Sequence, residues 1–488
     1  MNLSDNIIQS FVNSFMKVKL SKSIKEHSLL NKKMDVEFLN ALNDYFKQSL
    51  IDGDLPQILI KDISNITNTA VALGSKDKEN IGQTLLEKNI LTLNYLVSKL
   101  EKSSVLFDDK REQYFLEDDS SDNLAKQATA SSFDAKDIAS FQENIKELEK
   151  IILKDKIMAV IKANAYGHGM TEICKALIKI GIKNFAVATV EEALKIREIN
   201  DEVTILILGP IENEYMSKIS DGNIYFMITD FEEIEYIEKK GINIDVFLKI
   251  DTGMGRVGFQ EDEIPELIEK LKNCKYVNAT GVFSHFSSSD SDEDYTKLQE
   301  KRFKEISENI MKEIKSVKYR HILNSFGSLK NHNSEYDFVR IGIILYGGVT
   351  EKETAPYKFK PVMSLYAKIS HIKKLHKDSF ISYGNTYMAK KGDTVATVSI
   401  GYADGVRRDL SNKGYVYYKG HRCSIIGRVC MDQLMILIPE ELAESTKKGD
   451  IVEFFGNNIN IVEVANLCNT ISYEILCGIS QRVPRIYK

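Results

Sequence analysis

The chain has 488 residues, which is more than one ordinary domain holds, so two or three domains are expected. A hydrophobic fraction of 43% is enough for large buried cores, and a net charge of −5 argues against nucleic acid or an anionic membrane as the partner. Polar side chains interrupt the first twenty residues, and no apolar run approaches the ~18 residues that span a bilayer. We therefore expect a soluble, cytoplasmic protein.

The cysteine pattern agrees with a reducing compartment. None of the six cysteines forms a C-x-x-C pair; they are Cys174, Cys274, Cys423, Cys430, Cys468 and Cys477. Reduced, mostly buried thiols are favoured over a disulfide framework or a zinc site, and no metal is expected.

Residues 1–116 predict a helical N-terminal extension of unknown role. Apolar residues recur at helical spacing in residues 7–15, in a second stretch after a candidate cap at Asp35, and again in residues 81–100. The acidic, serine-containing segment 117–128 predicts a linker. The extension fits a structural appendage best, with a partner-binding module or a second activity as alternatives.

The section from 129 to 355 alternates β-rich and helical runs. It contains eight candidate strands, each followed by enough chain for a helix: Met158–Asn164, Phe185–Val190, Ile205–Gly209, Ile224–Thr229, Asp245–Asp251, Ala279–Phe286, Tyr319–Ser325 and Phe338–Tyr346. Eight strand-helix units favour an α/β fold of the (β/α)8 TIM barrel type, with a doubly wound open sheet as the alternative.

The section from 356 to 488 predicts a mostly β C-terminal domain. Its candidate strands, separated by Gly and Asp turns, are Met363–Ile372, Thr394–Ile400, Tyr415–Tyr418, Leu434–Ile438 and Ile451–Phe455. A short helix is expected at Ile461–Leu467.

Barrel enzymes carry their catalytic groups at the carboxyl ends of the strands. The first candidate strand includes Lys162, and burying an ammonium group in an apolar strand is costly. The lysine makes sense if it forms an imine with an aldehyde cofactor, while a lysine that snorkels to the surface is the alternative.

Further polar residues follow the later strands. Glycines surround Arg256 after the fifth strand, and His285 follows the sixth. Asn324 and Ser325 end the seventh strand, and Arg340 and Gly342 lie in the eighth, where barrels often bind phosphate. Each signal is modest, but together they predict one site at one face of the barrel.

Residues from about 130 to 488 resemble the alanine racemase family of fold-type III pyridoxal 5'-phosphate enzymes. The characteristic segments, in the family's order, are Ala159–Gly169 (AVIKANAYGHG), Ser382–Gly384 (SYG), Gly401–Gly405 (GYADG), Cys430–Asp432 (CMD) and the tail from Ser472 to Arg485. The resemblance implies interconversion of L-alanine and D-alanine, with D-alanine supplied for peptidoglycan synthesis.

The resemblance also implies roles for individual residues. Lys162 would hold the cofactor and act as one acid/base group, and Tyr383 would be the other, on the opposite cofactor face. His285 and Arg340 would support the tyrosine, and Arg340 would face the pyridine nitrogen, to which it donates a hydrogen bond but hardly a proton. The implied cofactor-binding residues are Lys162, Tyr166, His285, Asn324, Ser325, Arg340, Gly342, Ile343 and Tyr473.

Substrate binding is implied for a second group of residues: Arg256, Met431, Lys249, Tyr402 and Arg408. Lys249 matches a lysine that the family often carries as a carbamate, which would orient Arg256. In the family, Tyr383, Tyr402 and Met431 reach the active site of the partner chain, so a homodimer with two shared sites is expected.

The sequence departs from the family pattern near the site entrance. Val406, Arg407 and Arg408 follow Gly405, where the family usually has an aromatic residue, proline and arginine. The runner-up function is therefore a related racemase that acts on serine or has broad specificity. A fold-type III decarboxylase would lack the Ser-Tyr-Gly segment, and a cofactor-binding regulatory protein without turnover would lack the β domain.

Overall fold

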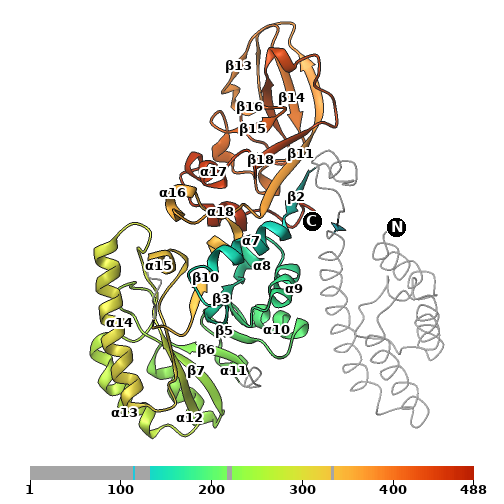
Figure 1. Ribbon diagram of the computed structural model, residues 1–488. Coiled ribbons are helices and arrows are strands. Elements are labelled where there is room, and N and C mark those ends of the chain that lie inside the picture. Colours follow the sequence, from blue (N-terminus) through green and yellow to red (C-terminus); the bar gives the residue numbers. More distant parts are fainter. Residues whose placement is uncertain (1–113, 116–131, 217–222, 331–334, 488) are drawn as a thin grey trace, which may run out of the picture. The chain divides into compact units, whose positions relative to one another are not determined.

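The computed structural model describes residues 114–115, 132–216, 223–330 and 335–487 (Figure 1). The helices expected in segment 1–116 and the linker expected at 117–128 lie outside the described residues. Within these two segments the structure describes only the two-residue strand β1 (Tyr114–Phe115). Among the described residues, no helix has the length and apolar character needed to cross a membrane.

The first domain is a TIM barrel, as predicted. Its eight parallel strands are β3 (Ile157–Val160), β4 (Asn184–Val187), β5 (Thr204–Ile207), β6 (Ile224–Ile228), β7 (Ile244–Lys249), β8 (Val277–Phe283), β9 (Tyr319–His321) and β10 (Val339–Ile341). They pair in chain order, and β10 pairs with β3. Two backbone bonds join β9 to β10 and close the ring, from Asp337 N to Arg320 O and from Arg340 N to Leu323 O, both 3.0 Å long.

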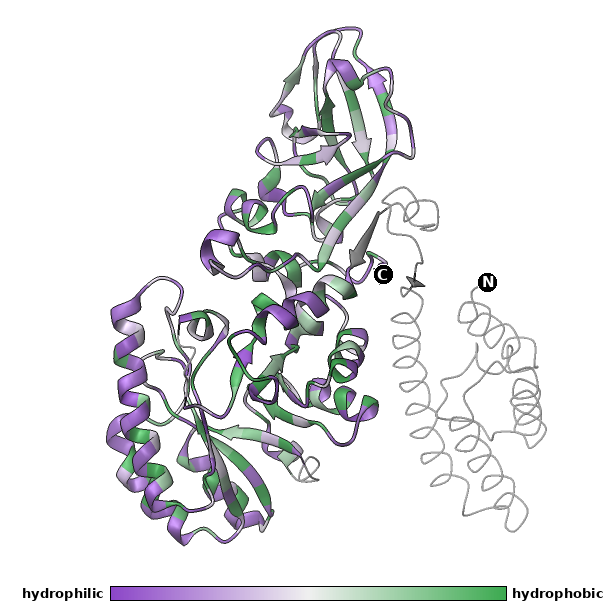
Figure 2. Cartoon of the chain, in the orientation of Figure 1, coloured by the Kyte–Doolittle hydropathy of each residue, from purple (hydrophilic) through white to green (hydrophobic). Residues whose placement is uncertain are grey.

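Helices cover the outside of the strands (Figure 1). They are α7 (Ile138–Leu148), α9 (Met170–Ile180), α10 (Val190–Ile199), α11 (Asn213–Met216), α12 (Phe231–Lys240), α13 (Ile264–Asn273), α14 (Glu293–Glu313) and α15 (Ser325–Lys330). The strands form because short apolar runs are buried on both faces, whereas the helices bury one stripe. Figure 2 shows the contrast along α14, which is mostly hydrophilic and buries only a few positions, among them Phe303 and Ile310.

All eight strands were predicted at the right places, but their predicted carboxyl ends were wrong. The first ends at Val160 rather than Asn164, and the last ends at Ile341 rather than Tyr346. The apolar residues after β10 are buried in a 3-10 helix, η3 (Ile343–Tyr346). The apolar run is therefore longer than the strand, which is why the predicted strand was too long. Lys162 is therefore not in a strand but just beyond one.

The second domain is built on antiparallel strands. Its main strands are β11 (Met363–Lys374), β14 (Thr394–Val398), β15 (Tyr415–Tyr418), β16 (His421–Ile426), β17 (Leu434–Ile438) and β18 (Ile451–Phe455). They run in the order β11-β14-β17-β16-β15-β18, and β18 pairs back with β11, so the sheet closes on itself. The smaller elements are β2 (Ser132–Lys136), β12 (Ser379–Phe380), β13 (Met388–Ala389), β19 (Arg485–Tyr487), α16 (Glu351–Thr354), α17 (Ile461–Leu467) and α18 (Ser472–Cys477).

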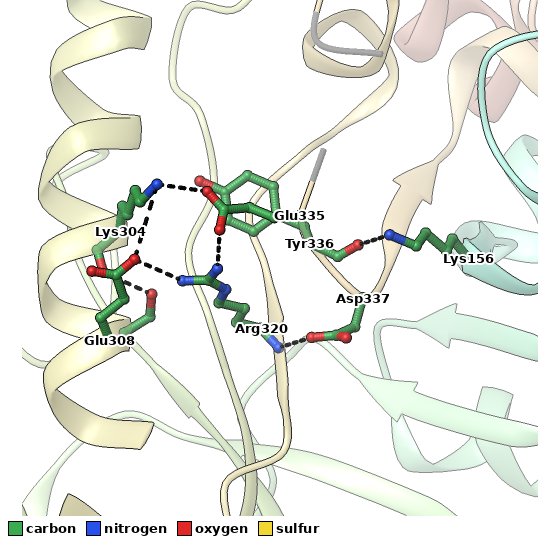
Figure 3. A network of polar contacts seen from close by, with 8 residues as sticks. Lys156, Lys304, Glu308, Arg320, Glu335, Tyr336 and Asp337 are labelled. Atoms are coloured by element: carbon green, nitrogen blue, oxygen red, sulfur yellow. Dashed lines mark hydrogen bonds and ion pairs between the residues drawn. The ribbon is translucent and has the colours of Figure 1, made fainter. Parts of the chain in front are cut away.

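A polar network reinforces the barrel at the amino end of β9 (Figure 3). The Arg320 side chain pairs with Glu335, which also accepts a 2.6 Å bond from Lys304 on α14. The Arg320 backbone N–H donates to the Asp337 carboxylate at 2.8 Å. These contacts tie β9 to α14 and to the segment before β10, on the barrel face opposite the carboxyl strand ends, where residues serve stability rather than catalysis.

Candidate active site

A cavity of about 310 Å³ lies at the carboxyl ends of the barrel strands. It is lined by Val160, Lys162, Ala163, Tyr166, Leu208, His285, Asn324, Ser325, Phe326, Arg340, Gly342, Ile343, Tyr473 and Cys477. All nine residues assigned to the cofactor from the sequence are therefore in one place. Tyr473 and Cys477 come from α18 of the second domain, so both domains build the cavity.

Lys162 begins a left-handed turn, α8 (Lys162–Tyr166), directly after the first barrel strand. The four residues from Ala163 to Tyr166 all have φ of 53°, and Gly167 follows at φ 77°. Left-handed backbone costs about 1–2 kcal/mol per non-glycine residue, so surrounding bonds must hold the turn. The Asn164 side chain accepts the Met170 N–H at 2.8 Å, and Gly167 N donates to Ala163 O at 3.0 Å.

The environment of Lys162 favours the neutral amine. Burial lowers the pKa of Lys162, and the positive charges of Arg256 and Arg340 lower it further, while Glu192 and Cys477 act in the opposite direction. An unprotonated amine is the form that attacks an aldehyde and the form that takes up a proton. The lowered pKa of Lys162 is therefore compatible with either reaction.

Arg340 is the buried centre of the site's hydrogen bonds. Its guanidinium is only 2% exposed and donates to the backbone oxygens of Ser284, at 2.6 Å, and Ile322, at 3.1 Å. It also contacts Nδ1 of His285 at 3.1 Å and Nδ1 of His321. Burial lowers the pKa of Arg340 to about 9, so the group keeps its charge at neutral pH.

Both histidines beside Arg340 are neutral. Burial and the Arg340 charge place the pKa of His285 and of His321 well below the ordinary value. A neutral imidazole that accepts at Nδ1 carries its proton on Nε2. The arginine therefore has two neutral acceptors, and no carboxylate contacts it among the described residues.

A group of hydroxyl-bearing residues in the cavity lining suits a phosphate group. The Ser325 hydroxyl accepts the Gly342 N–H at 2.9 Å, and a Cβ on Gly342 would lie 2.5 Å from the Tyr166 hydroxyl oxygen, so only glycine fits. The Tyr473 ring packs against Tyr166 at a tilt, with ring centroids 5.8 Å apart. A cavity lined by these hydroxyls, by Gly342 and by Lys162 fits a phosphorylated aldehyde cofactor.

Lys249 and Arg256 stand outside the cavity lining. Lys249 is buried and donates to Ile250 O at 2.7 Å, and burial together with the Arg340 charge lowers its pKa to about 8. Arg256 is exposed on the glycine-rich loop after β7, and its charge acts on Lys162, Lys249 and His285.

The remaining predicted site residues lie on turns of the second domain and do not line this cavity. Tyr383 is 73% exposed, Met431 is 53% exposed and Tyr402 is 44% exposed. The turns are joined, because the Ser382 hydroxyl donates to Arg428 O at 2.6 Å and Tyr402 N donates to Cys430 O at 3.0 Å. Arg408 is also exposed, a few residues beyond Tyr402.

The structure adds residues that sequence reasoning missed. Leu208 directly follows β5, a position that the strand-end argument could have included. Cys477 lies four residues after Tyr473 on the same helix and so on the same face. Val406, expected at the site entrance, is instead 4% exposed and packs in the core.

The fold and the cavity define a two-domain protein with a TIM barrel whose carboxyl-end cavity fits a phosphorylated aldehyde cofactor. The family model described as alanine racemase, N-terminal domain, matches residues 137–350, and the model described as alanine racemase, C-terminal domain, matches residues 362–487. The chain belongs to the alanine racemase family and is a pyridoxal-phosphate-dependent isomerase with alanine racemase function.

This chain matches almost the full length of its curated relatives. Alanine racemase of Carboxydothermus hydrogenoformans is 39% identical over 361 residues, which is 72% of this chain and 97% of that protein. The Fusobacterium nucleatum enzyme is 37% identical over 355 residues, 72% of this chain and 98% of that protein.

Solved structures agree. Alanine racemase of Clostridium difficile 630 superposes with a TM-score of 0.69 at 33% identity, covering 74% of this chain and 97% of that one. The Bacillus anthracis enzyme with bound L-Ala-P gives a TM-score of 0.68 at 32% identity, covering 74% and 96%.

Proposed function

We propose that Lys162 and Tyr383 are the two acid/base groups of the racemisation. Bound pyridoxal phosphate supplies the electron sink that makes the substrate α-proton removable. Inversion needs one group on each face of the α-carbon, one to take the proton and one to return it. The observation that carries the proposal is the position of Lys162, whose amine borders the cavity with its pKa lowered.

We assign the cavity residues to the parts of the cofactor. Ser325, Asn324, Tyr166, Tyr473 and the backbone of Gly342 and Ile343 would hold the phosphate. Arg340 would hold the pyridine nitrogen with His285 beside it. Because the guanidinium keeps its charge and its protons, it donates a hydrogen bond without protonating the ring. The cofactor is then a weak electron sink, which limits side reactions such as transamination.

We assign the substrate carboxylate to Arg256 and Met431, with Tyr402 and Arg408 at the entrance. Lys249, modified to a carbamate, would orient Arg256 for this role. A carbamate is an anion and pairs with Arg256, whereas the unmodified ammonium group would repel it. The burial of Lys249 and its pKa of about 8 support the modification, since only a neutral amine reacts with carbon dioxide.

The enzyme works as a homodimer in which each chain completes the other's site. Tyr383, Tyr402 and Met431 are exposed large side chains on joined turns and do not line the cavity of their own chain. In a dimer with a two-fold axis, the patch of each chain can lie at the cavity of the other chain, and the two contacts are equivalent. The second base of each site is therefore the Tyr383 of the partner chain.

The reaction belongs in the cytoplasm, where it supplies D-alanine for cell-wall peptidoglycan. Six free cysteines, without a disulfide, are typical of a reducing compartment. Residues 1–116 would be an appendage outside the catalytic part of the chain, which comprises the barrel and the β domain. The role of the appendage is structural rather than catalytic in this proposal, which is supported by relatives whose nearly full length is matched by 72% of this chain.

The first experiment measures D-alanine and D-serine formed from the L-amino acids by the full-length protein with pyridoxal phosphate. We expect rapid D-alanine formation, little D-serine, and loss of activity in Lys162→Ala and Tyr383→Phe. Faster D-serine would move the preference to a related racemase. Full activity in either variant would refute the two-base assignment.

The second experiment tests the shared site by mixing the two inactive variants under conditions that allow subunit exchange. A mixed dimer has one site with both substitutions and one site with neither, so mixing restores about one quarter of wild-type activity. The control mixes Lys162→Ala with a chain that carries both substitutions, which must stay inactive. No recovery after verified exchange would refute the shared site.

A further inference from the structure

Glu192 connects the cofactor lysine to the neighbouring strand loop. One carboxylate oxygen accepts the Ala163 N–H at 2.6 Å, and the other accepts the Ala188 N–H at 2.8 Å. Ala163 directly follows Lys162 and starts the left-handed turn, while Ala188 directly follows β4. One side chain thus bridges the carboxyl ends of two adjacent barrel strands.

In sequence, Glu192 looks like the glutamate of an ordinary helix capping box, three residues after the cap. Thr189 caps α10 by accepting the Glu192 N–H at 3.3 Å, and a glutamate three residues after a threonine cap usually bonds to the backbone beside the cap. That accounts for the bond to Ala188. It does not account for the second oxygen, which reaches 29 residues away to the backbone of the lysine turn.

The helix after β6 provides an internal comparison. Asp230 caps α12 and accepts the Glu233 N–H at 3.0 Å, so Glu233 holds the same position in its helix as Glu192. The Glu233 carboxylate bonds to the residues of its own cap: it accepts from the Thr229 N–H at 2.6 Å, from the Thr229 hydroxyl at 3.1 Å and from the Asp230 backbone. The same capping position is therefore purely local in α12 and reaches the site in α10.

We propose that Glu192 is a positioning residue for Lys162, one that holds the strained turn and places a negative charge beside the lysine amine. The bond to Ala163 fixes the peptide between Lys162 and Ala163, and with it the direction in which the lysine side chain leaves the backbone. Among the charges acting on Lys162, Arg256 and Arg340 lower its pKa, whereas Glu192 is the largest influence that raises it, followed by Cys477. The inference rests on the proposed role of Lys162.

Two variants separate the positioning role from simple capping. Glu192→Gln removes the charge and one of the two acceptors, and Glu233→Gln makes the same change in α12. The first readout is the pKa of Lys162, from the pH dependence of its acetylation followed by peptide mass spectrometry on the full-length chain after cofactor removal. The second is the pH profile of kcat in the loaded enzyme, which reports groups in the substrate complex.

We expect Glu192→Gln to lower the pKa of Lys162 by about one unit, to shift the acid limb of the kcat profile the same way, and to lower kcat at least tenfold. Glu233→Gln should lower the melting temperature while leaving the Lys162 pKa and the pH profile unchanged. If Glu192→Gln folds poorly, Glu192→Asp keeps the charge but is too short to reach both N–H groups, so kcat should fall with the Lys162 pKa near that of the wild type.

A Lys162 pKa unchanged in Glu192→Gln, or shifted equally by Glu233→Gln, would overturn the proposal. So would full wild-type kcat in Glu192→Asp. The acetylation readout needs no turnover, so it decides the question even if the wild-type protein racemises nothing, an outcome that would refute the proposed function instead.

Discussion

Asn144 on α7 joins the barrel to the second domain, and its replacement should be unusually costly. The side chain is 1% exposed and makes three hydrogen bonds. Its amide donates to Leu345 O at 3.0 Å and to Lys360 O at 2.9 Å, and its oxygen accepts the Lys360 N–H at 2.7 Å. Leu345 lies in η3, just after the residues assigned to the phosphate, and Lys360 precedes β11.

Asn144→Ala leaves those three backbone groups without their partner. At about 1 kcal/mol for each lost bond, the free energy of unfolding should fall by about 3 kcal/mol. Asn144→Asp should cost more, because it keeps only the bond from Lys360 N and turns a buried charge toward two carbonyl oxygens. Urea unfolding of the full-length protein, followed by circular dichroism, measures both values.

Asn184 provides the matched control. It is also buried, but its side chain donates one bond, to Asp155 O at 2.9 Å, so Asn184→Ala should cost about 1 kcal/mol. Equal costs for the two alanine variants, or a milder effect of Asn144→Asp than of Asn144→Ala, would show that bond count does not decide the loss.

Three further predictions concern the cavity and the barrel. Gly342→Ala should weaken pyridoxal phosphate binding at least tenfold, because its Cβ would lie 2.5 Å from the Tyr166 hydroxyl; cofactor titration by absorbance measures this, and wild-type affinity would contradict it. Added bicarbonate should raise the activity of the wild type but not of Lys249→Ala, and the effect should fade as the pH falls below about 8, where the Lys249 amine takes up a proton; an equal bicarbonate response in both proteins would exclude the carbamate. Arg320→Ala should lower the urea midpoint but leave kcat unchanged, since its network lies at the opposite end of the strands; a lower kcat would argue against that separation.

The sequence was sufficient for the order and type of the eight barrel strands and for five of the six main strands of the second domain. A strand buried on both faces is a short apolar run, so β5 is visible locally; β17 is also apolar throughout, although every second residue is only half-buried. β16 was missed because its first half, from His421 to Ser424, alternates polar with buried residues and lacks an apolar run. Parallel strands bring their carboxyl ends to one face, so the strand ends indicated a single site there, but the full set of cofactor residues, with Tyr473 of the second domain, came from the family resemblance.

The tertiary structure alone decided how the lysine is held. Ala163, Ala165 and Tyr166 carry no signal for left-handed backbone, so most of the turn after Lys162 follows from its partners and not from its own residues. One of those partners, Glu192, reads in sequence as a helix cap, and its bond to Ala163 exists because adjacent barrel strands end side by side. The two oxygens of a carboxylate can serve different segments, and only the folded chain shows which segments those are.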